Sequence, residues 1–117
     1  LSRNAKLKAA KIEQLKLKED EFMLNQSLNM AYKNALLKLA DSKKTIEAQK
    51  ENIKLVEDVF RITESNYMQG LASMSDVLNA NSSLIQAQMS YSDALNNYMK
   101  AFVELHKANG TIKEIAE

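Results

Sequence analysis

Hydrophobic residues recur at intervals of seven along most of this chain. One row of large side chains consists of Tyr32, Leu39, Ile46, Ile53, Phe60 and Tyr67, and a second of Val77, Leu84, Tyr91, Tyr98, Leu105 and Ile112. Three residues after each member of the second row except the last comes an alanine: Ala80, Ala87, Ala94, Ala101 and Ala108. A sevenfold repeat keeps one helix face toward a partner only when the helices supercoil left-handedly. The pattern predicts two long helices in a coiled coil, with the alanines allowing close backbone approach.

The turn between these helices has its own signals. Gly70 stands where a helix needs a left-handed residue to stop. Ser73 followed by Asp76 reads as a capping box, in which Ser73 is the N-cap. We therefore expect helices over about residues 2–68 and 74–108, joined by about five residues, which is short enough to make them antiparallel. The second glycine, Gly110, is expected to mark the end of the second helix.

The two expected helices differ in length, and this leaves part of the first one without a partner. At 1.5 Å per residue the first helix would be about 100 Å long and the second about half of that. Residues from Ser2 to about Asn34 would then lie beyond the second helix. An apolar stripe continues through this part, although Lys, Glu and Asn interrupt it: Leu1, Ala5, Ile12, Leu15, Phe22, Leu24, Leu28 and Ala31. Because this stripe cannot be buried alone, the chain is expected to be a fragment or an obligate oligomer.

Composition agrees with an all-α fold and says little about a ligand. The 117 residues include no proline or cysteine, only two glycines, and a net charge of +1. The absence of cysteine is compatible with the periplasm without establishing it. No apolar run approaches the length of a transmembrane helix, and no signal peptide is recognisable, so the leader of an exported parent would lie outside this chain. Basic residues gather between Arg3 and Lys18, but no aromatic residue interleaves with them, so a solvated helix face is favoured over nucleic-acid or membrane binding.

The sequence offers no candidate catalytic, metal or cofactor site. The one histidine, His106, follows a seam position and is expected to be a solvated helix residue. No His/Cys cluster has metal-ligand spacing, and no glycine-rich phosphate loop is present. A two-helix rod also lacks the concave, water-excluding site that catalysis requires. We therefore expect neither an enzyme nor a bound cofactor.

Around the turn the residues resemble a known family. The resemblance rests on Tyr67-x-x-Gly70, on Ser73-x-x-Asp76-Val77-Leu78-x-Ala80, and on Leu84, Ala87-Gln88, Tyr91, Ala94-Leu95, Asn97-Tyr98, Ala101, Leu105 and Ala108-x-Gly110, with Ala31 to Asn34 upstream. This register, from about Leu7 to Gly110, resembles the C-terminal helical repeat of TolC-like outer membrane efflux proteins.

The resemblance implies a function that composition does not show. Proteins of this family are homotrimers whose helices form a periplasmic α-barrel below a β-barrel in the outer membrane of Gram-negative bacteria. Their hairpin turns form the periplasmic entrance, which docks a membrane-fusion adaptor linked to an inner-membrane pump. Residues 1–117 would be a single segment of that α-barrel.

A role known for a residue of the family is expected only at a position of this sequence that matches the family's motif. Asp76 corresponds to an aspartate that, in the family, forms a ring around the channel entrance. An equally good interpretation is that Asp76 is the acid of the capping box. The family's second acidic position is Asn79 here, which would weaken an acidic ring. Tyr67 corresponds to a tyrosine of the gate, but a seam position is the favoured reading. Ala72 occupies the place of a gate arginine, which puts a salt-bridged closed state in doubt.

The resemblance also assigns the docking tip and leaves two alternatives. The tip that meets the adaptor would consist of Gly70, Leu71, Ala72 and Ser73. One alternative is a hairpin of the membrane-fusion adaptor itself, whose turn signature differs. The other is a free-standing structural coiled coil, in which both halves of the first helix would be buried within an oligomer.

Overall fold

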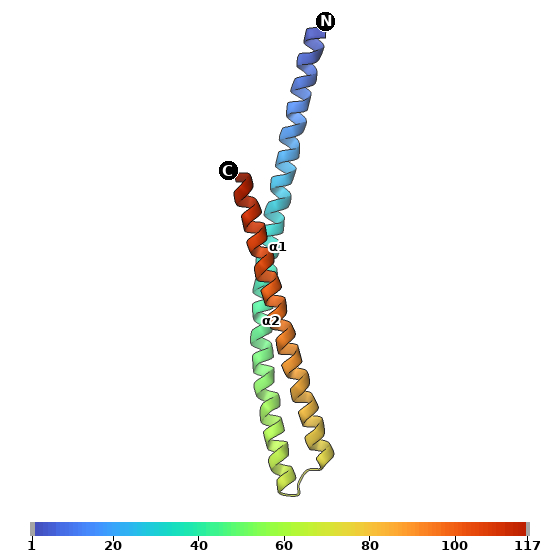
Figure 1. Ribbon diagram of the computed structural model, residues 1–117, viewed down its shortest axis with the longest axis vertical. Helices are drawn as coiled ribbons and strands as arrows, with labels where there is room; N and C mark the ends of the chain where they lie inside the picture. The colour runs from blue at the N-terminus through green and yellow to red at the C-terminus, as the bar shows by residue number, and fades with distance from the viewer. Residues whose placement is uncertain (1, 117) are drawn as a thin grey trace.

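The computed structural model describes residues 2–116 and shows two long helices packed antiparallel in an extended hairpin (Figure 1). Helix α1 comprises Ser2–Met68 and helix α2 comprises Met74–Ala116. The molecule measures 101 × 23 × 13 Å, so its length is that of α1. The all-α hairpin expected from the sevenfold rows is confirmed, and the described residues contain no strand.

Helix α2 is longer than expected, because it does not end at Gly110. It continues to Ala116, and the expected end near residue 108 is wrong. Gly70 is the one described glycine with positive φ, so Gly110 has no left-handed conformation that would stop a helix. A glycine inside a helix costs about 1 kcal/mol relative to alanine. Ile112, which is half-buried in the sevenfold row, extends the contact with α1 past this point.

The core of the hairpin is a narrow seam of small side chains. Among residues 2–114, the buried residues are all alanines: Ala35 on α1, and Ala80, Ala87, Ala94 and Ala101 on α2. The large side chains of the two sevenfold rows flank these alanines and are half-buried, except for Tyr67, which is exposed. A pair of helices encloses too little volume to bury a large side chain completely. Alanine is small enough to fit where the two backbones come closest together.

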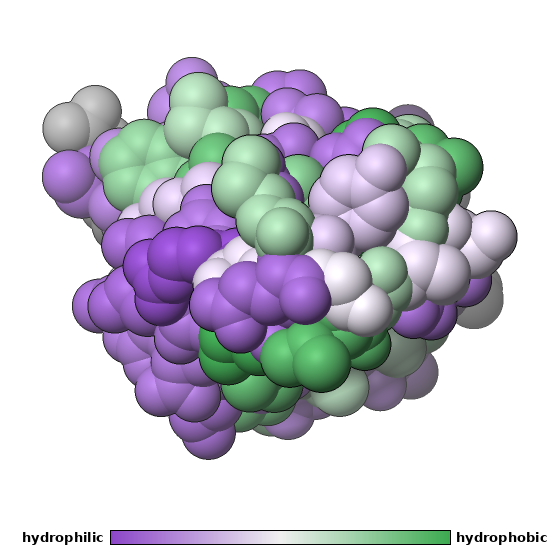
Figure 2. All heavy atoms as spheres, turned by 90° about the horizontal axis from the view of Figure 1, so that it is seen from below, coloured by the Kyte–Doolittle hydropathy of each residue, from purple (hydrophilic) through white to green (hydrophobic). Residues whose placement is uncertain are grey.

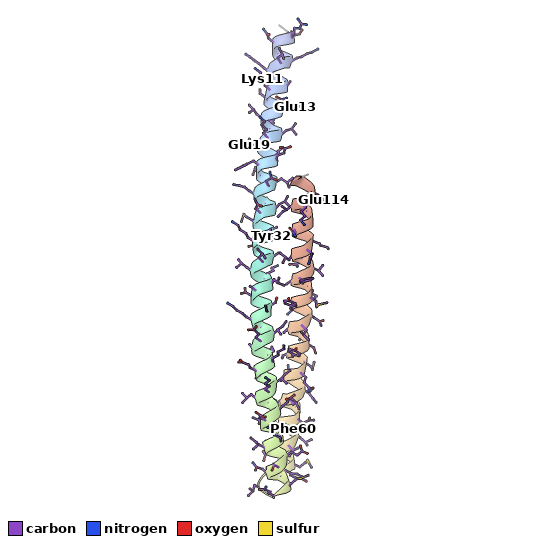
Figure 3. All side chains as sticks on the ribbon, turned by 90° about the vertical axis from the view of Figure 1, so that its left-hand side faces the viewer. Lys11, Glu13, Glu19, Tyr32, Phe60 and Glu114 are labelled. Atoms are coloured by element: carbon purple, nitrogen blue, oxygen red, sulfur yellow. The ribbon has the colours of Figure 1, made fainter. Side chains whose placement is uncertain are left out.

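The N-terminal part of α1 lies beyond the end of α2. Every residue from Ser2 to Ser27 is exposed, and Figure 3 shows Lys11, Glu13 and Glu19 on this part of the helix. Pairing begins at Leu28 and includes Tyr32, which are both half-buried. The unpartnered segment is therefore shorter than the sequence suggested, because α2 extends past Gly110. Neither helix of the described chain has a stretch that is both long and apolar enough to cross a bilayer.

Candidate functional site: the turn, the seam and the flanks

Backbone hydrogen bonds define how α1 ends. The Leu71 N–H donates to the Asn66 carbonyl at 2.7 Å, and the Gly70 N–H donates to the Tyr67 carbonyl at 3.0 Å. These two bonds are the pair that defines a Schellman motif, in which the residue after the last helical turn is left-handed. Gly70 supplies that residue with φ of 75°, and no atom lies within 4 Å of the position where a Cβ would stand. Glycine is required here because of the left-handed backbone conformation, and not because a side chain would clash with its surroundings.

A reciprocal pair of hydrogen bonds begins α2. The Asp76 N–H donates to Ser73 Oγ at 3.1 Å, and the Ser73 N–H donates to Asp76 Oδ2 at 2.9 Å. This is the capping box that the spacing of Ser73 and Asp76 predicts. The backbone hydrogen bond from Ser73, and then the hydrogen bond with its side chain, lower the pKa of the exposed Asp76 carboxyl below 3.8. Asp76 is therefore ionised at neutral pH and stabilises the first turn of α2.

The tip between the two caps presents apolar side chains to water. Met68 is 81% exposed and Leu71 is 75% exposed. In a Schellman motif the residue after the glycine often packs back on the helix, but Leu71 projects outward. Of the other residues assigned to the tip, Gly70 and Ser73 are exposed and Ala72 is half-buried. Figure 2, which views the molecule from the tip end, shows hydrophobic residues at this surface.

The candidate gate residues do not all lie together. A groove of about 510 Å³ runs from the turn along one side of the hairpin. It is lined by Val59, Thr63, Asn66, Leu71, Ala72, Asp76, Asn79, Ala80 and Ser83. Asp76 and Asn79 thus share a side of the hairpin, while Tyr67 is not part of the groove lining. Tyr67 is 40% exposed, more than the other members of its sevenfold row, and its assignment to the seam or to a gate stays a prediction.

The seam has a second row on α1 that the sequence did not reveal. Its members are Leu28, Ala35, Ser42, Gln49, Val56 and Thr63, which recur every seven residues and are buried or half-buried. Half of them are polar, so hydrophobicity does not identify the row. One signal was available, because this row follows the Tyr32 row by three residues, as the alanine row follows Val77 on α2. Across the seam from this row, Tyr91 and Tyr98 of α2 are half-buried.

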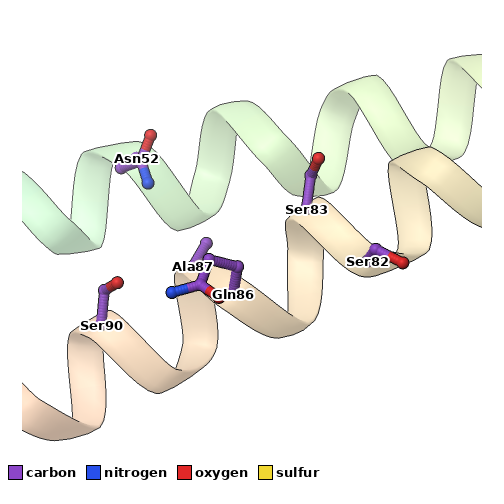
Figure 4. Close-up of a pocket in the computed structure, with 6 residues that line it drawn as sticks. All are labelled: Asn52, Ser82, Ser83, Gln86, Ala87 and Ser90. Atoms are coloured by element: carbon purple, nitrogen blue, oxygen red, sulfur yellow. The ribbon is translucent and has the colours of Figure 1, made fainter.

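Small polar residues follow the seam on the side that carries the groove. Figure 4 shows a hollow lined by Asn52 of α1 and by Ser82, Ser83, Gln86, Ala87 and Ser90 of α2. Farther from the turn on the same side, Lys38 Nζ lies 3.6 Å from the Glu104 carboxylate. Both of these side chains are more than half exposed, so their ion pair contributes little to stability. This side of α2 is uniformly hydrophilic: Asn79, Ser83, Gln86, Ser90, Asp93, Asn97, Lys100 and Glu104.

The described chain has few other groups that could bind a ligand. No group of three or more His, Cys, Asp or Glu residues lies close enough to hold a metal ion within residues 2–116. His106 is exposed on α2 and packs edge-on against Phe102, with ring centroids 4.5 Å apart. The basic residues near the N-terminus are exposed, as expected for a solvated helix.

This geometry defines a class of protein: a long antiparallel helical hairpin with a thin seam, an exposed turn and unpartnered apolar flanks. Comparison with known proteins identifies the family. A family model described as "Outer membrane efflux protein" matches residues 2–111, and the chain belongs to this family. Proteins of this family are non-enzymatic channels.

The chain is also similar to an individual curated protein. Nodulation protein T of Rhizobium leguminosarum bv. trifolii is 30% identical over 78 residues, which are 67% of this chain and 17% of that protein. The chain therefore spans about one sixth of the length of this relative. No solved structure matches the chain significantly.

Proposed function

We propose that this chain is a periplasmic helical segment of a trimeric efflux channel, and that its turn docks a periplasmic membrane-fusion adaptor linked to an inner-membrane pump. Membership in the outer membrane efflux protein family supports this proposal. The observation that carries the docking site is the exposed Leu71, which two capping motifs hold in a fixed position. A rigid apolar tip loses little conformational entropy when a partner covers it.

The chemistry of the tip suggests how the adaptor is recognised. Between Asn66 and Ser75 the chain has no charged side chain, and the one acid just beyond, Asp76, is engaged with Ser73. Docking therefore depends on apolar contact with Met68, Leu71 and Met74 rather than on ion pairs. Binding of this kind persists at high salt, because salt screens charges and not apolar contacts.

Cross-linking in the full-length channel tests the docking site. A photoreactive amino acid in place of Leu71 is expected to capture the adaptor in cells, and Leu71→Glu is expected to reduce export. Lys44, which is exposed on α1 far from the turn, provides the matched control position for both experiments. Capture of the adaptor at Lys44 and not at Leu71, with export unaffected by Leu71→Glu, would reject this docking site.

We further propose that three copies of Asp76 form an acidic ring at the channel entrance. The exposed position of Asp76 beside Asn79 in the groove supports this assignment. Asp76→Asn removes the charge but keeps an oxygen that can accept the hydrogen bond of the Ser73 N–H. This variant is expected to reduce block by multivalent cations in single-channel recordings, and Asn79→Asp is expected to increase it. Unchanged block in both variants would leave Asp76 with its capping role alone.

A further inference from the structure

The methionines of this chain all lie outside the seam. Each of the six has an exposed side chain: Met23, Met30, Met68, Met74, Met89 and Met99. The buried alanines and the half-buried members of the sevenfold rows, which hold α1 against α2, contain no sulfur. A chemical change at a methionine sulfur is therefore expected to alter the surface of the hairpin and to leave its packing intact.

Met68 is the most exposed of these methionines, and its position in the turn explains why. It is 81% exposed, whereas the other five are 49–64% exposed. Met68 is the last residue of α1, and the hydrogen bonds that involve Gly70 and Leu71 end the helix directly after it. No further helical turn follows that could place a side chain four residues later over Met68. A small molecule in solution therefore reaches this side chain more easily than it reaches the other methionines.

The surroundings of Met68 make the polarity of its side chain important. The chain has no charged residue between Asn66 and Ser75, and Leu71 is 75% exposed beside the turn. The proposed docking surface thus consists of apolar side chains. Oxidation turns a flexible, apolar thioether into a polar sulfoxide and is known to disrupt interfaces that contain methionine. Such a change at Met68 would occur within the apolar surface itself.

We propose that the Met68 thioether is a reversible oxidation site for peroxides and that its sulfoxide prevents docking of the adaptor. This inference rests on the proposed function, because it adds regulation to the docking site at the turn. The sulfoxide oxygen is a strong hydrogen-bond acceptor, and an apolar partner surface would bury it without a donor. An adaptor that is already docked covers the sulfur, so peroxides act on channels that are free of adaptor.

The oxidation step needs only a peroxide. A lone pair of the sulfur attacks one oxygen of hydrogen peroxide, the S–O bond forms as the O–O bond breaks, and the other oxygen leaves as water after a proton transfer. The sulfur loses two electrons, which the peroxide gains. A methionine sulfoxide reductase reverses the change. Two thiols then supply the electrons, and the products are the thioether, a disulfide and water.

Peptide mapping tests whether Met68 is the preferred site. Brief treatment of the purified full-length channel with hydrogen peroxide is expected to form sulfoxide at Met68 faster than at Met74, which is 49% exposed at the start of α2. Tandem mass spectrometry of the peptides from the turn measures both. Circular dichroism is expected to show the same thermal unfolding before and after treatment. Oxidation of Met74 ahead of Met68, or a loss of helix on oxidation, would overturn the proposal.

Capture of the adaptor by a photoreactive residue at position 71 tests the effect on docking. In cell envelopes that contain the channel, the adaptor and the pump, hydrogen peroxide added before illumination is expected to reduce capture about tenfold, as loss of one apolar anchor does in other interfaces. Methionine sulfoxide reductase with a thiol reductant is expected to restore it. Unchanged capture when Met68 is fully oxidised would contradict the proposal.

Variants with matched shapes assign the effect to one sulfur. Met68→Leu keeps an apolar side chain of similar volume that peroxide does not oxidise, so its capture is expected to resist treatment. Met30→Leu makes the same change on α1 far from the turn, at a side chain that is 64% exposed, and is expected to give no protection. Met74→Leu is likewise expected to leave the channel sensitive. Sensitivity of Met68→Leu, or protection by either control, would overturn the assignment to Met68.

A polar substitution reproduces the oxidised state without peroxide. Met68→Gln places a polar group at a similar distance from the backbone and is expected to lower capture while its thermal unfolding stays that of the parent. Normal capture by Met68→Gln would contradict the proposal.

Failure of this inference is distinguishable from failure of the proposed function. Capture of the adaptor that peroxide does not change would reject only the regulation by Met68. Absence of capture before any treatment would reject the docking site and the regulation together, and peptide mapping would still decide whether Met68 is the preferred oxidation site.

Discussion

The part of α1 that lies beside α2 and the part that extends beyond it have similar apolar content but differ in how far their apolar side chains are buried. From Leu28 to Thr63, the members of the two sevenfold rows meet α2 and are half-buried or buried. From Ser2 to Ser27 the helix exposes Leu7, Ile12, Leu15 and Phe22, each by more than half. An isolated helix is marginal in water, and most helical stability in proteins comes from packing of an apolar face. Seam contacts are therefore expected to stabilise the half near the turn more than the exposed half.

Overpacking the seam should produce the largest difference between the two parts. Ala94 is only 3% exposed, so Ala94→Leu forces extra methylene groups between the helices and is expected to cost about 1–3 kcal/mol. Ala9→Leu makes the same change in the exposed part and should cost nothing measurable. Thermal or urea unfolding monitored by circular dichroism measures both. Equal stability of the two variants would show that the seam is not closely packed.

The turn that creates the paired part should be the next most sensitive position. Gly70→Val places a β-branched residue at φ of 75°, and left-handed backbone costs an L-residue about 1–2 kcal/mol. Because the space around Gly70 is open, the loss reflects backbone strain and not a clash. Urea unfolding gives the change in free energy, and a crystal structure of the variant shows the turn. An unaltered turn with unaltered stability would contradict the left-handed assignment.

Substitution of Gly110, at the far end of the paired part, is expected to stabilise the chain, whereas substitution of Gly70 destabilises it. Its backbone is helical, and no atom lies within 4 Å of the Cβ position. Gly110→Ala is therefore expected to stabilise the chain by about 0.5–1 kcal/mol, because alanine has the higher helix propensity. Amide hydrogen exchange between residues 105 and 114 should slow accordingly. Faster exchange in this segment would indicate that α2 ends near residue 108 after all.

The smallest effect is expected from titration of Asp76. Its pKa is lowered in the folded chain, so its contribution to stability is complete above its unfolded pKa of about 3.9. The contribution is lost as the pH falls through the lower folded value. Asp76→Asn should therefore be less stable than the parent at neutral pH and approach it in acid. A stability difference that is independent of pH would exclude ionisation of Asp76 as the cause.

The sequence predicts most of this fold because its signals are local. The sevenfold rows locate both helices, and Gly70, Ser73 and Asp76 locate the turn and its caps. The end of α2 was missed because Gly110 was taken as a stop, although Ile112, two residues later, continues the sevenfold row. Tyr67 continues the sevenfold row in the sequence, but it is more exposed than the other members of that row because it lies next to the turn.

The candidate site is less predictable because its properties arise between helices. The spacing of Asp76 and Asn79 by three residues places them on one face of α2, but only the packing of α1 shows that this face lines a groove. The polar members of the second α1 row, such as Gln49, have no hydrophobic signal at all. Leu78, Ile85 and Met99 are spaced by multiples of seven just as the seam residues are. Only the packing of α1 shows that these three residues are left exposed.

The alanine row has a mechanical consequence. Because the alanines let the two backbones approach closely, the paired helices are expected to move together as a single strut. A partner that tilts the turn would therefore displace the distant N-terminal end of α1 over a much larger arc. A partner that binds at Leu71 can therefore move the opposite end of a rod 101 Å long.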